Sequence, residues 1–114
     1  MKYMLGIYLD ETTLPPASSD APHQMSPAFV AYVEALRSAG VLVAGDRLKP
    51  TDTATTVRVV DGKTQVLDGP YADTKEQLGG YFVIDVPDID AALSWAARCP
   101  GAARGALEVR PIWE

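Results

Sequence analysis

An α+β fold is predicted for this chain of 114 residues by the order of its apolar segments. A β-α-β unit comes first, two short strands joined by a tight turn follow, and a second β-α-β unit ends the sequence. The strand segments are short apolar runs, the helical segments have apolar residues three and four positions apart, and Gly and Pro separate them. We therefore expect one four-stranded sheet with two helices, and a hairpin inserted between the two units.

The first unit begins with a strand, Lys2–Leu9, which is apolar on both faces, as in strands that meet water on neither side. Asp10–Gln24 is predicted to be a surface loop. Ser26-Pro27 then opens a helix, because serine accepts a bond from a free amide and proline at the first helical position loses none. This helix ends at Gly40, and Val41–Leu48 is the second strand. The apolar face of the helix consists of Phe29, Tyr32, Val33 and Leu36.

The inserted hairpin is predicted from Thr55–Val60 and Thr64–Leu67. Asp61-Gly62 lies between them, and this dipeptide tolerates the positive φ angles of a two-residue hairpin turn. The next strand of the main sheet, Tyr81–Val86, is again apolar on both faces.

The second helix is predicted to start at a capping residue, Asp88, and to end at Pro100-Gly101. Its expected buried stripe is Ile89, Ala92, Leu93 and Ala96. Ala106–Ile112 forms the last strand. This order of elements predicts the ferredoxin-like split βαβ arrangement. Right-handed crossovers then place Tyr81–Val86 beside Lys2–Leu9 in the middle of the sheet.

These two central strands predict a homodimer. Two helices cover only one face of a four-stranded sheet, so the apolar side chains of the other face would form a patch larger than monomers usually expose. A second copy that packs sheet against sheet would cover it. The alternative is that the inserted hairpin folds back over the face.

Composition excludes several classes of protein. Ten Lys and Arg against fifteen Asp and Glu give a net charge of −5, without a basic run, so no nucleic-acid partner is expected. One His and one Cys cannot build a thiolate or imidazole metal site. The apolar run Tyr3–Leu9 is too short to span a membrane and lacks the features of a secretory signal. We expect a single cytoplasmic domain over residues 1–114.

The segments LRSAGVLVAGDRL and DGPYADTKEQLGGY give the sequence a family resemblance. The chain resembles the YCII-related proteins over nearly its whole length except Thr12–Gln24, and in particular the branch named for an Asp-Gly-Pro-Phe motif. Here the motif is Asp68-Gly69-Pro70-Tyr71. The resemblance implies a bacterial cytoplasmic protein that forms a ferredoxin-like, dimeric α/β barrel. It implies no settled activity, and the genes of such proteins often stand beside those of extracytoplasmic-function sigma factors.

One departure from the family pattern concerns catalysis. Related proteins are thought to use a His-Asp pair whose histidine opens the first helix. The matching position here is Phe29, and the only histidine, His23, precedes it in the loop. That pair is therefore not carried over to this chain.

Most polar groups suited to chemistry converge on one edge of the predicted sheet, beside an apolar interior of the kind in which ligands bind. They are Asp10, Glu11, His23, Asp46, Arg47, the loop 68–80 and residues 98–104.

Within this edge, Asp68 or Glu76 is the expected acid or base, with His23 as a further candidate. Lys75 or Arg47 would hold an anion, and Tyr71 would close over the ligand. Asp46 and Asp68 complete the ligand-binding candidates.

Each residue also has a purely structural interpretation. Asp68-Gly69-Pro70 could serve only to form a turn, and the other charged residues of the loop could simply be exposed to water. Asp46 and Arg47 could form a local ion pair. The loop's carboxylates could also bind a divalent cation through oxygens, although we assign no metal. Cys99 is expected to be a structural thiol, and Trp95 and Trp113 core or interface aromatics.

Two functions follow as hypotheses. The first is a homodimeric small-molecule-binding protein, or a cofactor-free enzyme, with a pocket between sheet and loops. The second is a non-catalytic accessory that binds a protein partner such as an extracytoplasmic-function sigma factor, to which the acidic charge is suited. No cofactor is expected, since no GxGxxG, GxSxG or HExxH motif occurs.

Overall fold

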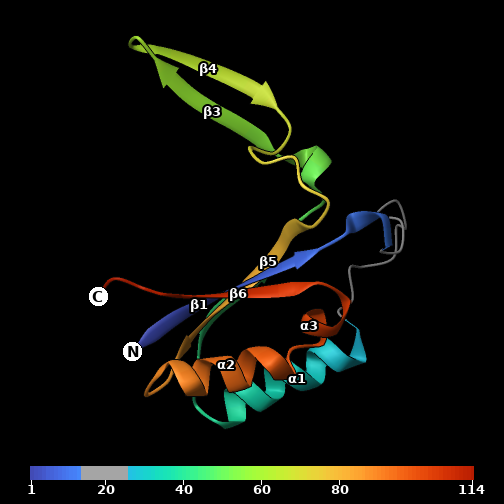
Figure 1. Cartoon of the computed structure of the whole chain (residues 1–114), viewed down its shortest axis with the longest axis vertical. Helices are drawn as coiled ribbons and strands as arrows, with labels where there is room; N and C mark the ends of the chain where they lie inside the picture. Colours follow the sequence, from blue (N-terminus) through green and yellow to red (C-terminus); the bar gives the residue numbers. More distant parts are fainter. Residues whose placement is uncertain (14–25) are drawn as a thin grey trace.

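The computed structural model describes residues 1–13 and 26–114 and has a mixed α+β architecture (Figure 1). Its strands are β1 (Lys2–Leu9), β2 (Leu42–Arg47), β3 (Thr55–Val60), β4 (Lys63–Asp68), β5 (Gln77–Asp85) and β6 (Ala106–Pro111). Its helices are α1 (Pro27–Ser38), α2 (Ile89–Arg98) and α3 (Pro100–Arg104), and short 3-10 turns lie at Glu11–Thr13 and Thr51–Thr53.

The main sheet has the strand order β2-β5-β1-β6, and each neighbouring pair is antiparallel. The strand that follows the hairpin therefore lies beside the first strand, in the middle of the sheet, as predicted. Leu9 pairs with Gln77, Tyr8 with Ala106 and Arg47 with Gly80. The ends of β1 and β2 and the starts of β5 and β6 therefore meet at one edge of the sheet, as predicted.

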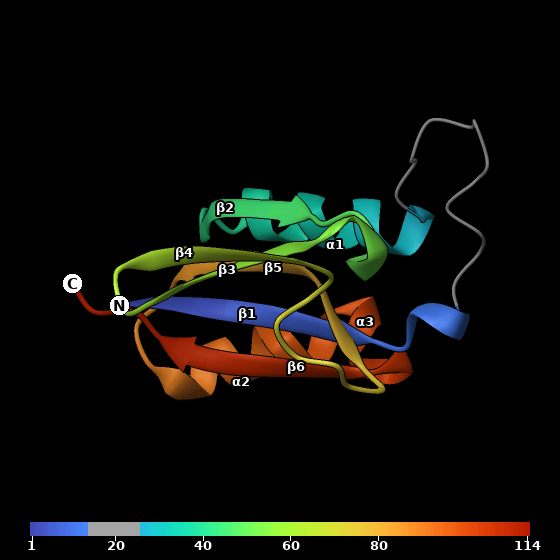
Figure 2. The same cartoon turned by 90° about the horizontal axis from the view of Figure 1, so that it is seen from above.

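The helices cover one face of this sheet. Seen from the opposite side, α1 lies behind the β2 half and α2 behind the β6 half (Figure 2). Between sheet and helices lies the core, whose largest fully buried side chains are Tyr3, Leu5, Leu36 and Ile84. The other face, called here the open face, carries half-buried apolar side chains: Met4, Tyr8, Tyr81 and Val83.

The local signals at α1 and the hairpin are confirmed. The Ser26 hydroxyl accepts a bond from the Phe29 amide at 3.3 Å, and Gly40 ends the helix with a φ of 71°. At the hairpin turn Asp61 and Gly62 have φ angles of 52° and 75°. Both angles are positive, as a two-residue turn between right-twisted strands requires.

The predicted buried stripe of α2 is wrong in two of its four members. Ala92 and Ala96 are buried, but Ile89 and Leu93 are exposed. The stripe is rotated towards Trp95, which packs against the core and whose ring meets that of Tyr32 edge-on. The large ring buries more apolar surface than a leucine would, so it sets the helix's rotation.

Other features also differ from expectation. β5 begins at Gln77 rather than Tyr81, because pairing with β1 extends through Gly79-Gly80, where the register shifts. A short extra helix, α3, starts at Pro100, since proline also suits a first helical position. Trp113 is 99% exposed, so its interpretation as a core residue is wrong and a role at an interface stays a prediction.

Tyr32 and Cys99 are expected to make stability fall at alkaline pH. Burial raises the pKa of both groups above their ordinary values. The unfolded chain therefore loses these protons at a lower pH than the folded chain. The contribution of the two groups to the free energy of unfolding is full below about pH 9 and is lost as the pH rises through their folded-state pKa values. Thermal melts from pH 7 to 11 should show a shallower decline for Tyr32→Phe than for the wild-type chain. Equal slopes would contradict this assignment.

The same substitution is expected to cost about 1 kcal/mol at neutral pH. The Tyr32 hydroxyl donates to the backbone oxygen of Trp95 at 2.7 Å, joining α1 to α2. Phenylalanine leaves that oxygen without its donor. Chemical denaturation at pH 7 measures the loss.

Candidate functional site

The two ends of the inserted hairpin meet at the polar edge of the sheet. Thr55 pairs with Asp68, and the Gly69 amide donates to the Ala54 oxygen at 2.7 Å. The segments 48–54 and 69–77 must therefore run back to the sheet together. We call them the two stems of the hairpin.

A carboxylate fixes the first stem to the body. Both oxygens of Glu11 accept bonds from Thr51, one from its amide at 2.9 Å and the other from its hydroxyl at 2.8 Å. The Glu11 amide in turn donates to the Gln77 side chain at 3.3 Å. The end of β1, the first stem and the start of β5 are thus joined through one residue.

Between the stems and the sheet lies a cavity of about 520 Å³, called here the root cavity. This volume is within the range of ligand sites. Its apolar lining consists of Tyr8, Leu48, Pro50, Ala54, Pro70, Tyr71, Ala72 and Leu78. Its polar lining consists of Lys49, Thr51, Thr53, Thr74 and Gln77. Lys49 is the one charged side chain among these described lining residues.

A smaller hollow of about 190 Å³ lies next to the root cavity, on the hairpin side. Asp68 lines it, with Arg58, and Tyr71 and Pro70 line both spaces. The Arg58 guanidinium lies 5.0 Å from the centre of the Tyr71 ring, within the distance at which a cation attracts the face of an aromatic ring. The hollow is smaller than typical ligand pockets, and we treat it as an extension of the larger space.

Asp46 is engaged on the open face rather than at the root cavity. Its carboxylate accepts a hydrogen bond from the Tyr81 hydroxyl at 2.9 Å, and that bond raises the pKa of Tyr81. Arg47 follows on the strand, where alternation directs its side chain to the other face. Across residues 1–13 and 26–114 no ion pair joins Asp46 to Arg47.

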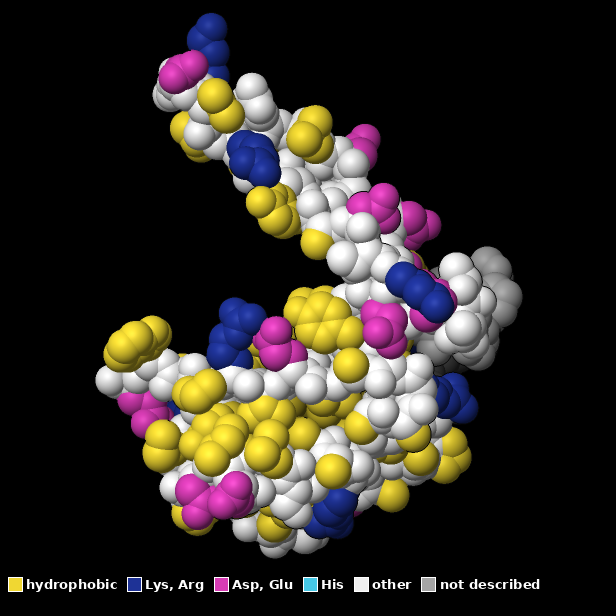
Figure 3. All heavy atoms as spheres, viewed as in Figure 1, with side chains coloured by type: hydrophobic (Ala, Val, Ile, Leu, Met, Phe, Trp, Pro, Cys, Tyr) yellow, Lys and Arg dark blue, Asp and Glu magenta, His cyan; other side chains and the backbone are white. Residues whose placement is uncertain are grey.

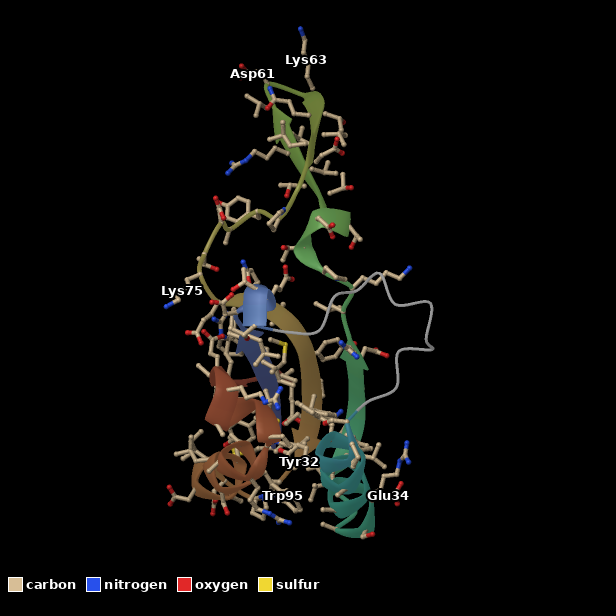
Figure 4. All side chains as sticks on the ribbon, turned by 90° about the vertical axis from the view of Figure 1, so that its right-hand side faces the viewer. Tyr32, Glu34, Asp61, Lys63, Lys75 and Trp95 are labelled. Carbon is tan, nitrogen blue, oxygen red and sulfur yellow. The ribbon has the colours of Figure 1, made fainter. Side chains whose placement is uncertain are left out.

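Lys75 and Glu76 are exposed on the second stem. Lys75 points away from the body in Figure 4, and neither residue lines the root cavity. Near them, hydrogen bonds from Thr12 lower the pKa of Asp10, with a smaller contribution from the charge of Lys75. His23, the remaining candidate, lies outside the described residues.

Two kinds of functional feature are absent from residues 1–13 and 26–114. There, no three His, Cys, Asp or Glu side chains gather as a metal site would require. No helix in the same ranges is long and apolar enough to cross a membrane.

The structure thus brings Tyr71 to the root cavity and Asp68 beside it, whereas Asp46, Arg47, Lys75 and Glu76 line neither space. The opposite wall of the root cavity, Lys49 to Thr53, contains none of the site residues that were predicted from the sequence. Its signal was available in the hairpin: if Thr55 pairs near Asp68, the residues just before and after the hairpin must be neighbours.

The fold and the cavity define a small α+β protein with a pocket at the base of an inserted hairpin. The family model for the YCII-related domain matches residues 1–114. An uncharacterised protein of Rhizobium meliloti (strain 1021) is 37% identical over 114 residues, which covers 98% of this chain and 92% of the relative. The chain belongs to the YCII-related family.

Proposed function

We propose that this protein is a homodimeric small-molecule-binding protein whose ligand occupies the root cavity. The observation that carries the proposal is the cavity itself, about 520 Å³ of space with two tyrosines, two leucines and two prolines in its wall. Apolar concavities with a few polar groups are the usual form of ligand sites. We also propose the ferredoxin-like arrangement, which the strand order β2-β5-β1-β6 supports. A single cytoplasmic domain and a dimeric α/β barrel complete the proposal.

The lining supports an organic anion with an apolar body as the ligand class. Lys49 supplies a positive charge, the Gln77 side-chain amide can donate hydrogen bonds, and Tyr8 and Tyr71 supply aromatic surface. If the bound molecule is transformed, the acid or base is Asp68 or Glu76, and of these two Asp68 lines the adjoining hollow.

Binding of 8-anilinonaphthalene-1-sulfonate tests this site, since the dye has an aromatic body and one negative charge. We expect Lys49→Gln to weaken binding about tenfold, the loss of one charge-assisted bond. The uncharged parent, N-phenyl-1-naphthylamine, should bind both proteins equally. Fluorescence titration measures both affinities.

The matched control is Lys63→Gln, because Lys63 lies at the far tip of the hairpin (Figure 4). It should leave both affinities unchanged. Leu78→Glu, which adds a carboxylate to the wall, should abolish dye binding. Dye affinity that survives Leu78→Glu would place the bound dye elsewhere and contradict the proposed site.

The competing proposal is an accessory that binds a protein, for which the net charge of −5 suits a basic partner. Native mass spectrometry of protein freshly purified from its own cell separates the two. A small-molecule adduct on a dimer supports the ligand site, whereas a stable complex with a second protein, such as a sigma factor, supports the accessory.

A further inference from the structure

The hairpin formed by β3 and β4 is a second sheet of only two strands. Its six residue pairs run from Thr55 with Asp68 to Val60 with Lys63, and neither strand pairs with the main sheet. An isolated two-stranded hairpin is marginally stable in water. In Figure 3 it stands clear of the body, with an open gap between it and the sheet. We call this hairpin the arm.

One face of the arm is apolar and uncovered. Val57 pairs with Val66, and Val59 pairs with Thr64, so the three valines lie on the same side. Their exposed fractions are 60% for Val57, 69% for Val59 and 61% for Val66. The other side carries the arm's two cations, Arg58 and Lys63, beside Gln65, Val60 and Leu67. A sheet with this alternation usually packs its apolar side and solvates its charged side.

The open face of the main sheet is also uncovered. Met4 lies between Val83 and Arg110 in the sheet, and Tyr81 lies beside Gly6. The helices cover the opposite face, and the arm of the same chain does not descend onto this one (Figures 1 and 3). Both surfaces are therefore available to one partner.

We propose that the valine face of the arm packs against a second copy of this chain, at the β2 side of its main sheet, with the two arms exchanged reciprocally. This inference rests on the proposed homodimer and adds the element that holds it. A twofold dimer uses the same patch of both copies, so in the proposed barrel the two open faces cover each other and the exchanged arms cover both valine faces.

Interface size favours this occupant. A stable interface buries about 800 Å² on each partner, more than three valines can supply. The arm and the open face together offer a larger surface, although the outer strands of the sheet carry Asp46, Glu108 and Arg110 on that face. An unrelated protein seated on one of the two surfaces would leave the other in water.

Chemical cross-linking between two different chains tests the contact. A chain with Val59→Cys and a chain with Ala44→Cys are given different tags and co-expressed, then treated with a short bismaleimide. Ala44 pairs with Val83 and shares its face, and Cys99 is buried. Because each chain has a single added thiol, a doubly tagged product arises only between copies. We expect such a product at high yield.

The control replaces Ala44→Cys by Val30→Cys on α1, which is exposed on the helical side. We expect its yield to be at least about tenfold lower, since a cross-link requires proximity. Equal yields from the two pairs would overturn the arm exchange.

Sedimentation velocity gives an independent measurement. In Val57→Thr/Val59→Thr/Val66→Thr, the β-branched shape and strand propensity remain while the apolar surface is reduced. We expect the dimer to dissociate at least about 100-fold more readily. Val60→Thr, on the other side of the arm, should have little effect. Circular dichroism verifies that each variant is folded.

The outcomes separate the two proposals. A wild-type dimer that the triple substitution leaves intact overturns the arm exchange and leaves the homodimer standing. A monomeric wild-type chain overturns both. The dye titration at Lys49 reports on the root cavity independently of either result.

Discussion

Gly105→Ala is expected to lower the free energy of unfolding by at least about 3 kcal/mol. Gly105 lies between α3 and β6, and its backbone lies against the Tyr8 carbonyl of β1. The Cβ atom of an alanine at position 105 would overlap the Tyr8 carbonyl oxygen and lie 3.1 Å from the side chain of Leu9. The nearer atom belongs to a strand backbone in the middle of the sheet, so no side-chain rotation relieves the contact. The strand or the turn must move.

Gly40→Ala is the matched control. Gly40 has a φ of 71° but open space around its Cβ position, so alanine there adds only backbone strain, about 1 kcal/mol. In a domain of this size about 1 kcal/mol shifts the melting temperature by roughly 4 °C. Calorimetry should therefore show Gly105→Ala melting roughly 12 °C or more below the wild type. A loss no greater than that of Gly40→Ala would mean that the junction between α3 and β1 is looser than the structure shows.

The elements of the fold are largely predictable because their signals are local. Lys2–Leu9 was predicted to the residue, since its apolar run is bounded by a charge at either end. Asp61-Gly62 fixes the hairpin because few other dipeptides accept its φ angles. Failures occur where a tertiary contact decides between local options. Periodicity alone placed Leu93 rather than Trp95 on the buried face of α2. Trp95 packs there because its partner ring, Tyr32, belongs to another helix.

The candidate site is half predictable for a related reason. Tyr71 belongs to a recognisable motif, and its loop was expected at the polar edge. The facing wall at Lys49 and Thr51 carries no motif, and becomes a wall only when the register of the hairpin joins the two stems. Asp46 shows how sequence neighbours can mislead. It precedes Arg47 in the sequence, which suggests a local ion pair, but the pairing of β2 with β5 gives it Tyr81 as its hydrogen-bond partner.

Glu11→Ala is expected to loosen the base of the arm without unfolding the body. Each of the two bonds from Thr51 ends on a charged oxygen, and such bonds contribute about 1.5–3 kcal/mol each. Alanine removes both, so the local opening free energy of the first stem should fall by about 3 kcal/mol. The Gly69 amide, which bonds Ala54 at the same base, should then exchange its hydrogen about 100-fold faster.

Hydrogen exchange followed by mass spectrometry measures this, with Glu34→Ala as the control. Glu34 is also a carboxylate with a bonded partner, but it and Arg37 are both largely exposed, where an ion pair contributes little. Exchange at Gly69 should be unchanged in that variant. Dye binding at the root cavity should weaken in Glu11→Ala, because Thr51 lines it. Fast exchange confined to Thr51 itself, with Gly69 still protected, would show that the hairpin pairing rather than Glu11 holds the stems together.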